Sequence, residues 1–153
     1  MILRSFAMLA LLWPAALCAE ELPQAVQGAI DDARADCESF EAGDFSFEPE
    51  AIIKTPLTQT ADGWLVDETH MRCSSAASMY CGTGGCGLFL IVGDHITERL
   101  AKAWSIVDFY DRPVVLLDVH GSLCGGINPT PCVEALIWDD EASVFTTLAP
   151  RDQ

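Results

Sequence analysis

The chain has 153 residues, with 23 acidic side chains against eight basic ones and a formal net charge of −15. A surface this negative repels nucleic acid and anionic membranes, so we expect no nucleic-acid partner. Half of the residues are hydrophobic, which is enough for the core of one domain of ordinary size.

The first 19 residues have the pattern of a secretory signal peptide. Arg4 supplies the positive charge, residues 6–13 form an unbroken apolar run, and small residues lead to Ala19, after which we expect cleavage. The apolar run is shorter than the roughly 20 residues that span a bilayer. An uncleaved anchor and a lipoprotein signal at Cys18 are the alternatives, although the residue before Cys18 is not small. We therefore expect a periplasmic or secreted protein whose single mature domain covers residues 20–153, with no membrane span.

The cysteines agree with export. Cys18 would leave with the signal peptide, and an even number of cysteines after such a signal predicts disulfides. Sequence alone does not decide the pairing, but two pairs would close short loops rich in glycine or proline. The favoured pairs are Cys37–Cys73, Cys81–Cys86 and Cys124–Cys132. Structural zinc is the alternative use, but the tight Cys-x2-Cys spacing is absent, so we expect no metal and no cofactor.

Residues 22–40 are predicted to form one amphipathic helix. Apolar residues recur at steps of three and four, and the apolar face holds Val26, Ile30, Ala33 and Cys37. Because Cys37 lies on this face, its disulfide is expected to tie the helix to a sheet.

From residue 50 the pattern changes to short segments rich in β-branched and aromatic residues, separated by turn residues. Connections this short favour antiparallel neighbours. The predicted strands are 51–55, 64–70, 88–92, 96–100, 103–109, 114–119, 133–138 and 144–147, with 114–119 as a central strand. We expect an α+β domain in which the N-terminal helix packs on one curled antiparallel sheet.

Two long segments have an unusual composition. Residues 80–86 read Tyr-Cys-Gly-Thr-Gly-Gly-Cys, and residues 120–125 read His-Gly-Ser-Leu-Cys-Gly. These motifs resemble those of a family of uncharacterised secreted or periplasmic proteins of Gram-negative bacteria. The resemblance implies an N-terminal helix that ends in a cysteine before the strands, as Cys37 does here. Many members carry an acidic turn that resembles a calcium-binding loop. Only Asp62-Gly63 of that turn remains in this chain, which leaves calcium binding open.

Four residues are the candidates for chemistry. Glu68 and His70 close one predicted strand, and Asp118 and His120 close another. Residues i and i+2 of a strand face the same side, so each pair would present a carboxylate and an imidazole together. If the two strand ends were adjacent, the four groups could bind a metal or carry out acid–base chemistry. A small metal-dependent enzyme using His70 and His120 is therefore the alternative function, and surface residues at strand ends are the simpler interpretation.

No motif in the chain is specific for catalysis. The loop between Cys81 and Cys86 precedes a strand, whereas redox cysteines usually begin a helix, and Ser122 lacks the Gly-x-Ser-x-Gly frame of a hydrolase. Once Arg4 is removed, 23 acidic side chains face seven basic ones, a net charge of −16. We therefore expect a binding module whose partner is a protein or envelope component, cationic if charge steers it. One version of this hypothesis is an inhibitor of a cationic cell-wall hydrolase.

Overall fold

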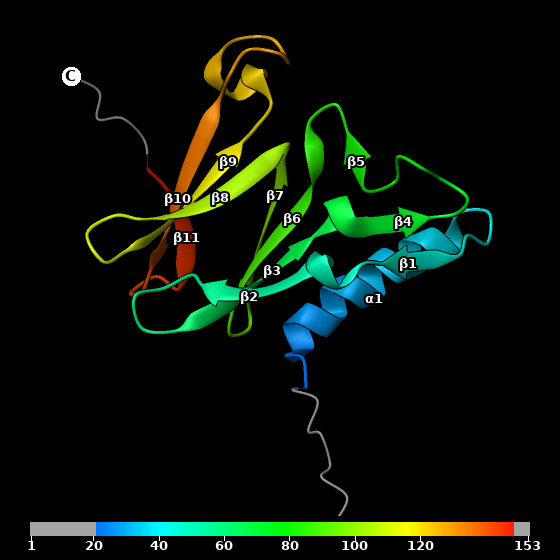
Figure 1. Ribbon diagram of the computed structural model, residues 1–153, viewed down its shortest axis with the longest axis horizontal. Helices are drawn as coiled ribbons and strands as arrows, with labels where there is room; N and C mark the ends of the chain where they lie inside the picture. The colour runs from blue at the N-terminus through cyan, green and yellow to red at the C-terminus, as the bar shows by residue number, and fades with distance from the viewer. Residues whose placement is uncertain (1–20, 149–153) are drawn as a thin grey trace, which may run out of the picture.

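The computed structural model describes residues 21–148, which form three layers (Figure 1). One helix covers one face of a five-stranded sheet, and a four-stranded sheet covers the other face. The predicted signal peptide and its cleavage site after Ala19 lie outside the described residues.

The helix is the first layer. α1 spans Gln24–Ser39 and buries Val26, Ala29, Ile30, Ala33 and Cys37, which confirms the predicted apolar face. Its buried side chains pack against Val66 and Ile91 of the central sheet.

The central sheet forms the middle layer, in the order β2-β3-β6-β5, with β7 paired to the other edge of β6. Its strands are β2 (Ile52–Pro56), β3 (Asp62–Asp67), β5 (Cys81–Gly82), β6 (Gly85–Val92) and β7 (His95–Ala101). A separate ribbon joins β1 (Phe45–Phe47) to β4 (Met71–Cys73) beside the helix.

The outer sheet is the third layer, in the order β11-β10-β9-β8. Its strands are β8 (Ala103–Asp108), β9 (Pro113–Asp118), β10 (Val133–Asp139) and β11 (Val144–Thr147). β9 pairs on both sides, which confirms its predicted central position. Every strand pairing in the two sheets is antiparallel, as the short connections predicted.

The prediction of one curled sheet is wrong. β7 pairs only with β6 and β8 pairs only with β9, so the chain changes sheet at the bend of Lys102. The reason lies in β6, which is apolar on both faces. Ile91 packs toward the helix, whereas Leu88 and Leu90 pack against the outer sheet. Two apolar faces need two covering layers, and the second half of the chain supplies one of them as a separate sheet.

The predicted strand over residues 64–70 is also too long. The strand ends at Asp67, and Glu68–His70 form a 3-10 helix, η2. The Asp67 side chain accepts a hydrogen bond from Thr69 N at 2.9 Å, and this local bond turns the chain out of the ladder. Other short elements were not predicted, namely β1, β4, β5, η1 (Pro49–Ala51) and η3 (Gly121–Cys124).

Three disulfides cross-link the domain, and they confirm the favoured pairing. Cys37–Cys73 joins α1 to β4, Cys81–Cys86 links opposed positions of β5 and β6, and Cys124–Cys132 closes the segment between β9 and β10. Three such bonds are typical of a protein that folds in an oxidising compartment. Within residues 21–148 no helix has the length and apolar character needed to span a bilayer.

Candidate binding site

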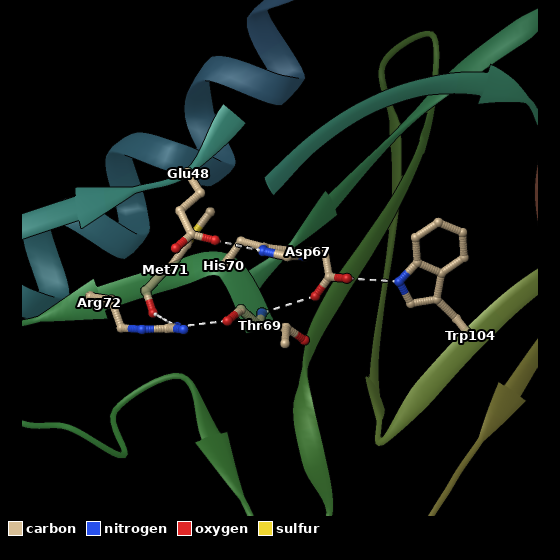
Figure 2. A network of polar contacts seen from close by, with 7 residues as sticks. All are labelled: Glu48, Asp67, Thr69, His70, Met71, Arg72 and Trp104. Atoms are coloured by element: carbon tan, nitrogen blue, oxygen red, sulfur yellow. Dashed lines mark hydrogen bonds and ion pairs between the residues drawn. The ribbon is translucent and has the colours of Figure 1, made fainter. Parts of the chain in front are cut away.

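The first predicted pair of site residues lies on η2, in the bend between β3 and β4. His70 Nδ1 lies 3.0 Å from Glu48 Oε2. Figure 2 draws this contact as a dashed line. The hydrogen bond from His70, supported by its charge and by that of Arg72, lowers the pKa of Glu48. His70 therefore ties η2 to the end of β1, and its predicted partner Glu68 does not share a strand face with it.

Glu68 lies half-buried over β6. A Cβ added at Gly87 would collide with its carboxylate, so Glu68 could hold this position only beside a glycine or would have to move. Burial is the main cause that raises the pKa of Glu68 to about 7. The negative charge of Glu98 adds to this rise, a backbone hydrogen bond from Gly87 opposes it, and Asp36 and Asp67 contribute further. This carboxyl therefore changes its charge near neutral pH.

Asp67, the residue before Glu68, is a buried carboxylate that links the two large sheets. Its Oδ2 accepts a hydrogen bond from Trp104 Nε1 at 2.7 Å, and its Oδ1 accepts one from Thr69 N (Figure 2). Trp104 belongs to β8, so the bond crosses from the central sheet to the outer sheet. The pattern of residues 64–70 did not reveal this role, because it depends on a tryptophan 37 residues away.

The second predicted pair lies at the end of β9, in the outer sheet. Asp118 is exposed, and His120 caps η3, where its Nδ1 lies 2.8 Å from Ser122 Oγ and accepts a bond from Ser122 N. The two pairs thus follow strands of different sheets, β3 and β9. Over residues 21–148 no three His, Cys, Asp or Glu side chains are grouped so that they could hold a metal. The structure does not gather the four candidates into one centre.

The segment from His120 to Cys132, here called the recognition loop, is held in its conformation by a disulfide and by hydrogen bonds. The Cys124–Cys132 disulfide closes it, and Lys102 Nζ donates a hydrogen bond to Asn128 O at 2.8 Å. Gly121 packs so closely that an added Cβ would lie 2.7 Å from Thr130 O. Thr130 N in turn donates to the carbonyl of Ile127 at 2.8 Å. The loop is therefore stabilised by contacts within itself and by Lys102 from the bend between β7 and β8.

An apolar groove runs beside the recognition loop. Its volume is about 330 Å³, and its walls come from the loop, β10 and the end of β11. Most of the lining is apolar, and the polar side chains of Glu134 and Thr147 also reach it. The apolar and cysteine residues of the lining are Val119, Leu123, Cys124, Cys132, Val133, Ala135 and Leu148. Leu123 and Ile127 are each 70 % exposed, so large apolar side chains project from the loop at and near the groove. Exposed apolar side chains that gather around a hollow are typical of an interaction surface.

Comparison with known proteins adds nothing to this geometry. No protein-family model, no curated protein and no solved structure matches this chain. The recognition loop and its groove therefore stand as the candidate site on their shape and chemistry.

The sequence located this loop but not its exposed residues. Residues 121–131 contain no charged side chain, and a loop without charges that holds a leucine and an isoleucine is unusual on a protein this acidic. This contrast between an uncharged loop and an acidic protein was the feature of the sequence that could have indicated an interaction surface. Only the tertiary structure shows that Leu123 and Ile127 find no cover in the core.

Proposed function

We propose that this protein is an exported binding module whose recognition surface is the His120–Cys132 loop with the groove beside it. The partner we propose is a cationic protein of the cell envelope. One observation carries the proposal, namely the exposure of Leu123 and Ile127 on a disulfide-closed loop that borders an apolar groove. Export to the periplasm or to the medium belongs to the same proposal, and the three disulfides support it.

Rigidity supports binding at this loop. A segment that is already ordered loses little conformational entropy when a partner docks, so more of the contact energy contributes to affinity. The disulfide, the Lys102–Asn128 bond and the close packing of Gly121 supply this order before any partner arrives.

Charge supports the nature of the partner. With 23 acidic against eight basic side chains, the protein attracts basic surfaces over a distance and speeds their encounter. The recognition loop itself is uncharged between residues 121 and 131, so the contact there is apolar. We therefore expect a partner with a basic surface around an apolar side chain that enters the groove.

The test begins with capture of partners from an envelope extract of the producing organism, using the oxidised protein as bait, and continues with purified partner. Surface plasmon resonance should show an association rate that falls as ionic strength rises, with a smaller change in dissociation. The double variant L123S/I127S should weaken binding at least about tenfold, because it removes both exposed anchors.

The matched control is L100S. Leu100 is a similarly exposed leucine, 57 % accessible, but it belongs to β7 of the central sheet and does not line the groove. L100S should bind like the wild type. Unchanged affinity in L123S/I127S, or an equal loss in L100S, would contradict the proposed surface.

A further inference from the structure

The outer sheet ends in a strand that is open to pairing. β8 pairs with β9 on one side, and among residues 21–148 no strand pairs with its other side. From Ala103 to Val107 it contains no charged residue, no proline and no glycine. Those residues are the usual means by which an edge strand avoids association. An edge without them offers free backbone groups to an added strand.

The hydrogen bonds of the β8–β9 hairpin determine which residues offer those groups. Phe109 and Arg112 bond each other in both directions, with N–O distances of 2.9 and 3.2 Å. Bonded and non-bonded pairs alternate along an antiparallel ladder, so every second residue of β8 points its N–H and C=O to the open side. These residues are Trp104, Ile106 and Asp108.

We propose that β8 pairs with β8 of a second copy of this chain, antiparallel and centred on Ser105. Two residues that both point to the open side must meet, so Ile106 of one copy lies opposite Trp104 of the other. The twofold axis then passes between the two copies of Ser105.

Charge selects this register. With Ser105 on the axis, Asp108 of each copy lies opposite Lys102 of the other, so both ends of the joined strands carry a pair of opposite charges. A shift by two residues in one direction places Asp108 opposite Trp104, and a shift in the other direction places it opposite Leu100. Both shifts keep the hydrogen-bond alternation but lose the two ion pairs. The centred register is therefore the one of the three that keeps both the backbone hydrogen bonds and the two ion pairs.

Lys102 takes part through its side chain. Its backbone N–H donates to Asp118 O at 2.7 Å, so the intermolecular ladder ends before it. Its Nζ donates to Asn128 O at 2.8 Å, which leaves two further donors of the ammonium group for a carboxylate.

The side chains of the two copies also match in polarity. The half-buried Ile106 and Trp104 would meet on the side that faces the core, and the exposed Val107 and Ala103 would meet on the outer side. The product is one continuous sheet made from two four-stranded sheets. The recognition loop follows β9 at the Lys102 end of β8, so the two loops of the dimer would lie at opposite ends of the joined strands.

The test is sedimentation velocity of the oxidised protein over a wide concentration range, with charge reversals at the two ends of β8. The wild type should show a monomer–dimer equilibrium. D108K alone should be monomeric because it brings two lysines together, and K102D alone because it brings two aspartates together. An equal mixture of the two variants should dimerise again, since each contact then regains one acid and one base.

A second variant covers the case in which K102D does not fold. In a non-bonded antiparallel pair the opposed Cα atoms lie about 4.5 Å apart, so S105C should form a disulfide between two copies across the axis. V107C, also at an exposed position but off the axis, is the matched control and should not cross-link. A protein that stays monomeric at every concentration overturns the proposal. A dimer unaffected by D108K, a mixture that fails to recover, or equal cross-linking of S105C and V107C overturns it as well.

Discussion

Two cysteine-rich segments of similar composition take opposite roles in this protein. Residues 73–86 lie against the helix, where Tyr80 is buried and donates its hydroxyl hydrogen to Ala33 O at 2.8 Å. Residues 120–132 project from the outer sheet and leave large apolar side chains such as Leu123 in solvent. The first segment contributes Cys73 and Tyr80 to the core, whereas the second presents Leu123 and Ile127 to solvent.

The span of the disulfides explains the difference. Cys37–Cys73 joins residues 36 apart and brings its segment onto another element, which then buries it. Cys124–Cys132 joins residues only 8 apart, so it sets the shape of a loop without supplying anything to cover it. Two segments that are both rich in cysteine and glycine therefore do not need to have the same role.

Loss of the long-range disulfide should have the largest effect on stability. The variant C37A/C73A is expected to lower the free energy of unfolding by about 4 kcal/mol, and C124A/C132A by about 2.5 kcal/mol, because the entropy that a disulfide removes from the unfolded chain grows with loop length. Urea denaturation of the oxidised proteins measures both. A larger loss of unfolding free energy in C124A/C132A than in C37A/C73A would contradict this explanation of the difference between the two segments.

Ionisation of Glu68 should have the second-largest effect on stability. This carboxyl lies close to the first segment: burial is the main cause that raises the pKa of Tyr80, and the charge of Glu68 is the next. The native state raises the pKa of Glu68 from 4.5 to about 7, so between these values it holds a proton that the unfolded chain releases. Stability therefore falls as pH rises through this window. The cost is absent below about pH 4.5 and complete above about pH 7, where it amounts to on the order of 2–3 kcal/mol, because solvent screens part of the charge of this half-buried carboxyl.

The variant E68Q keeps the shape of the neutral acid and isolates this effect. It should match the wild type at pH 4 and exceed it in unfolding free energy at pH 8, as measured by urea denaturation at each pH. E98Q is a graded control, since it removes the neighbouring charge that contributes most to the shift after burial. In E98Q the loss of unfolding free energy between pH 4 and pH 8 should be smaller than in the wild type but still present. Equal stability of wild type and E68Q at pH 8 would show that the carboxylate is not buried as described.

The smallest effect concerns single hydroxyl groups in the two segments. Y80F removes a buried hydrogen bond to Ala33 O and should cost about 1 kcal/mol. S122A removes an exposed hydroxyl in the recognition loop and should stay within about 0.5 kcal/mol. Thermal unfolding resolves the two, and a greater loss from S122A would assign the second segment to the core after all.

Local patterns predicted much of this fold because their causes are local. The apolar spacing that marked α1 and the turn residues between the strands act over a few positions, and the helix and the eight longer strands follow them. The pairing of Cys81 with Cys86 and of Cys124 with Cys132 followed from short loops for the same reason. The error at residues 68–70 was also local, because a side chain of Asp67 replaced a ladder bond with a turn.

The sequence by itself predicted the helix, the eight longer strands, their antiparallel pairing, the use of the cysteines in disulfides and the acidic character of this protein. Only the tertiary structure decided that the strands divide into two sheets, that Trp104 binds Asp67, that the four candidate side chains do not gather into one metal-binding group, and that Leu123 and Ile127 face solvent. The physical reason is that burial depends on which distant element covers a face. A residue's neighbours along the chain determine its preferred conformation, but the layer packed above it decides whether it is core or surface.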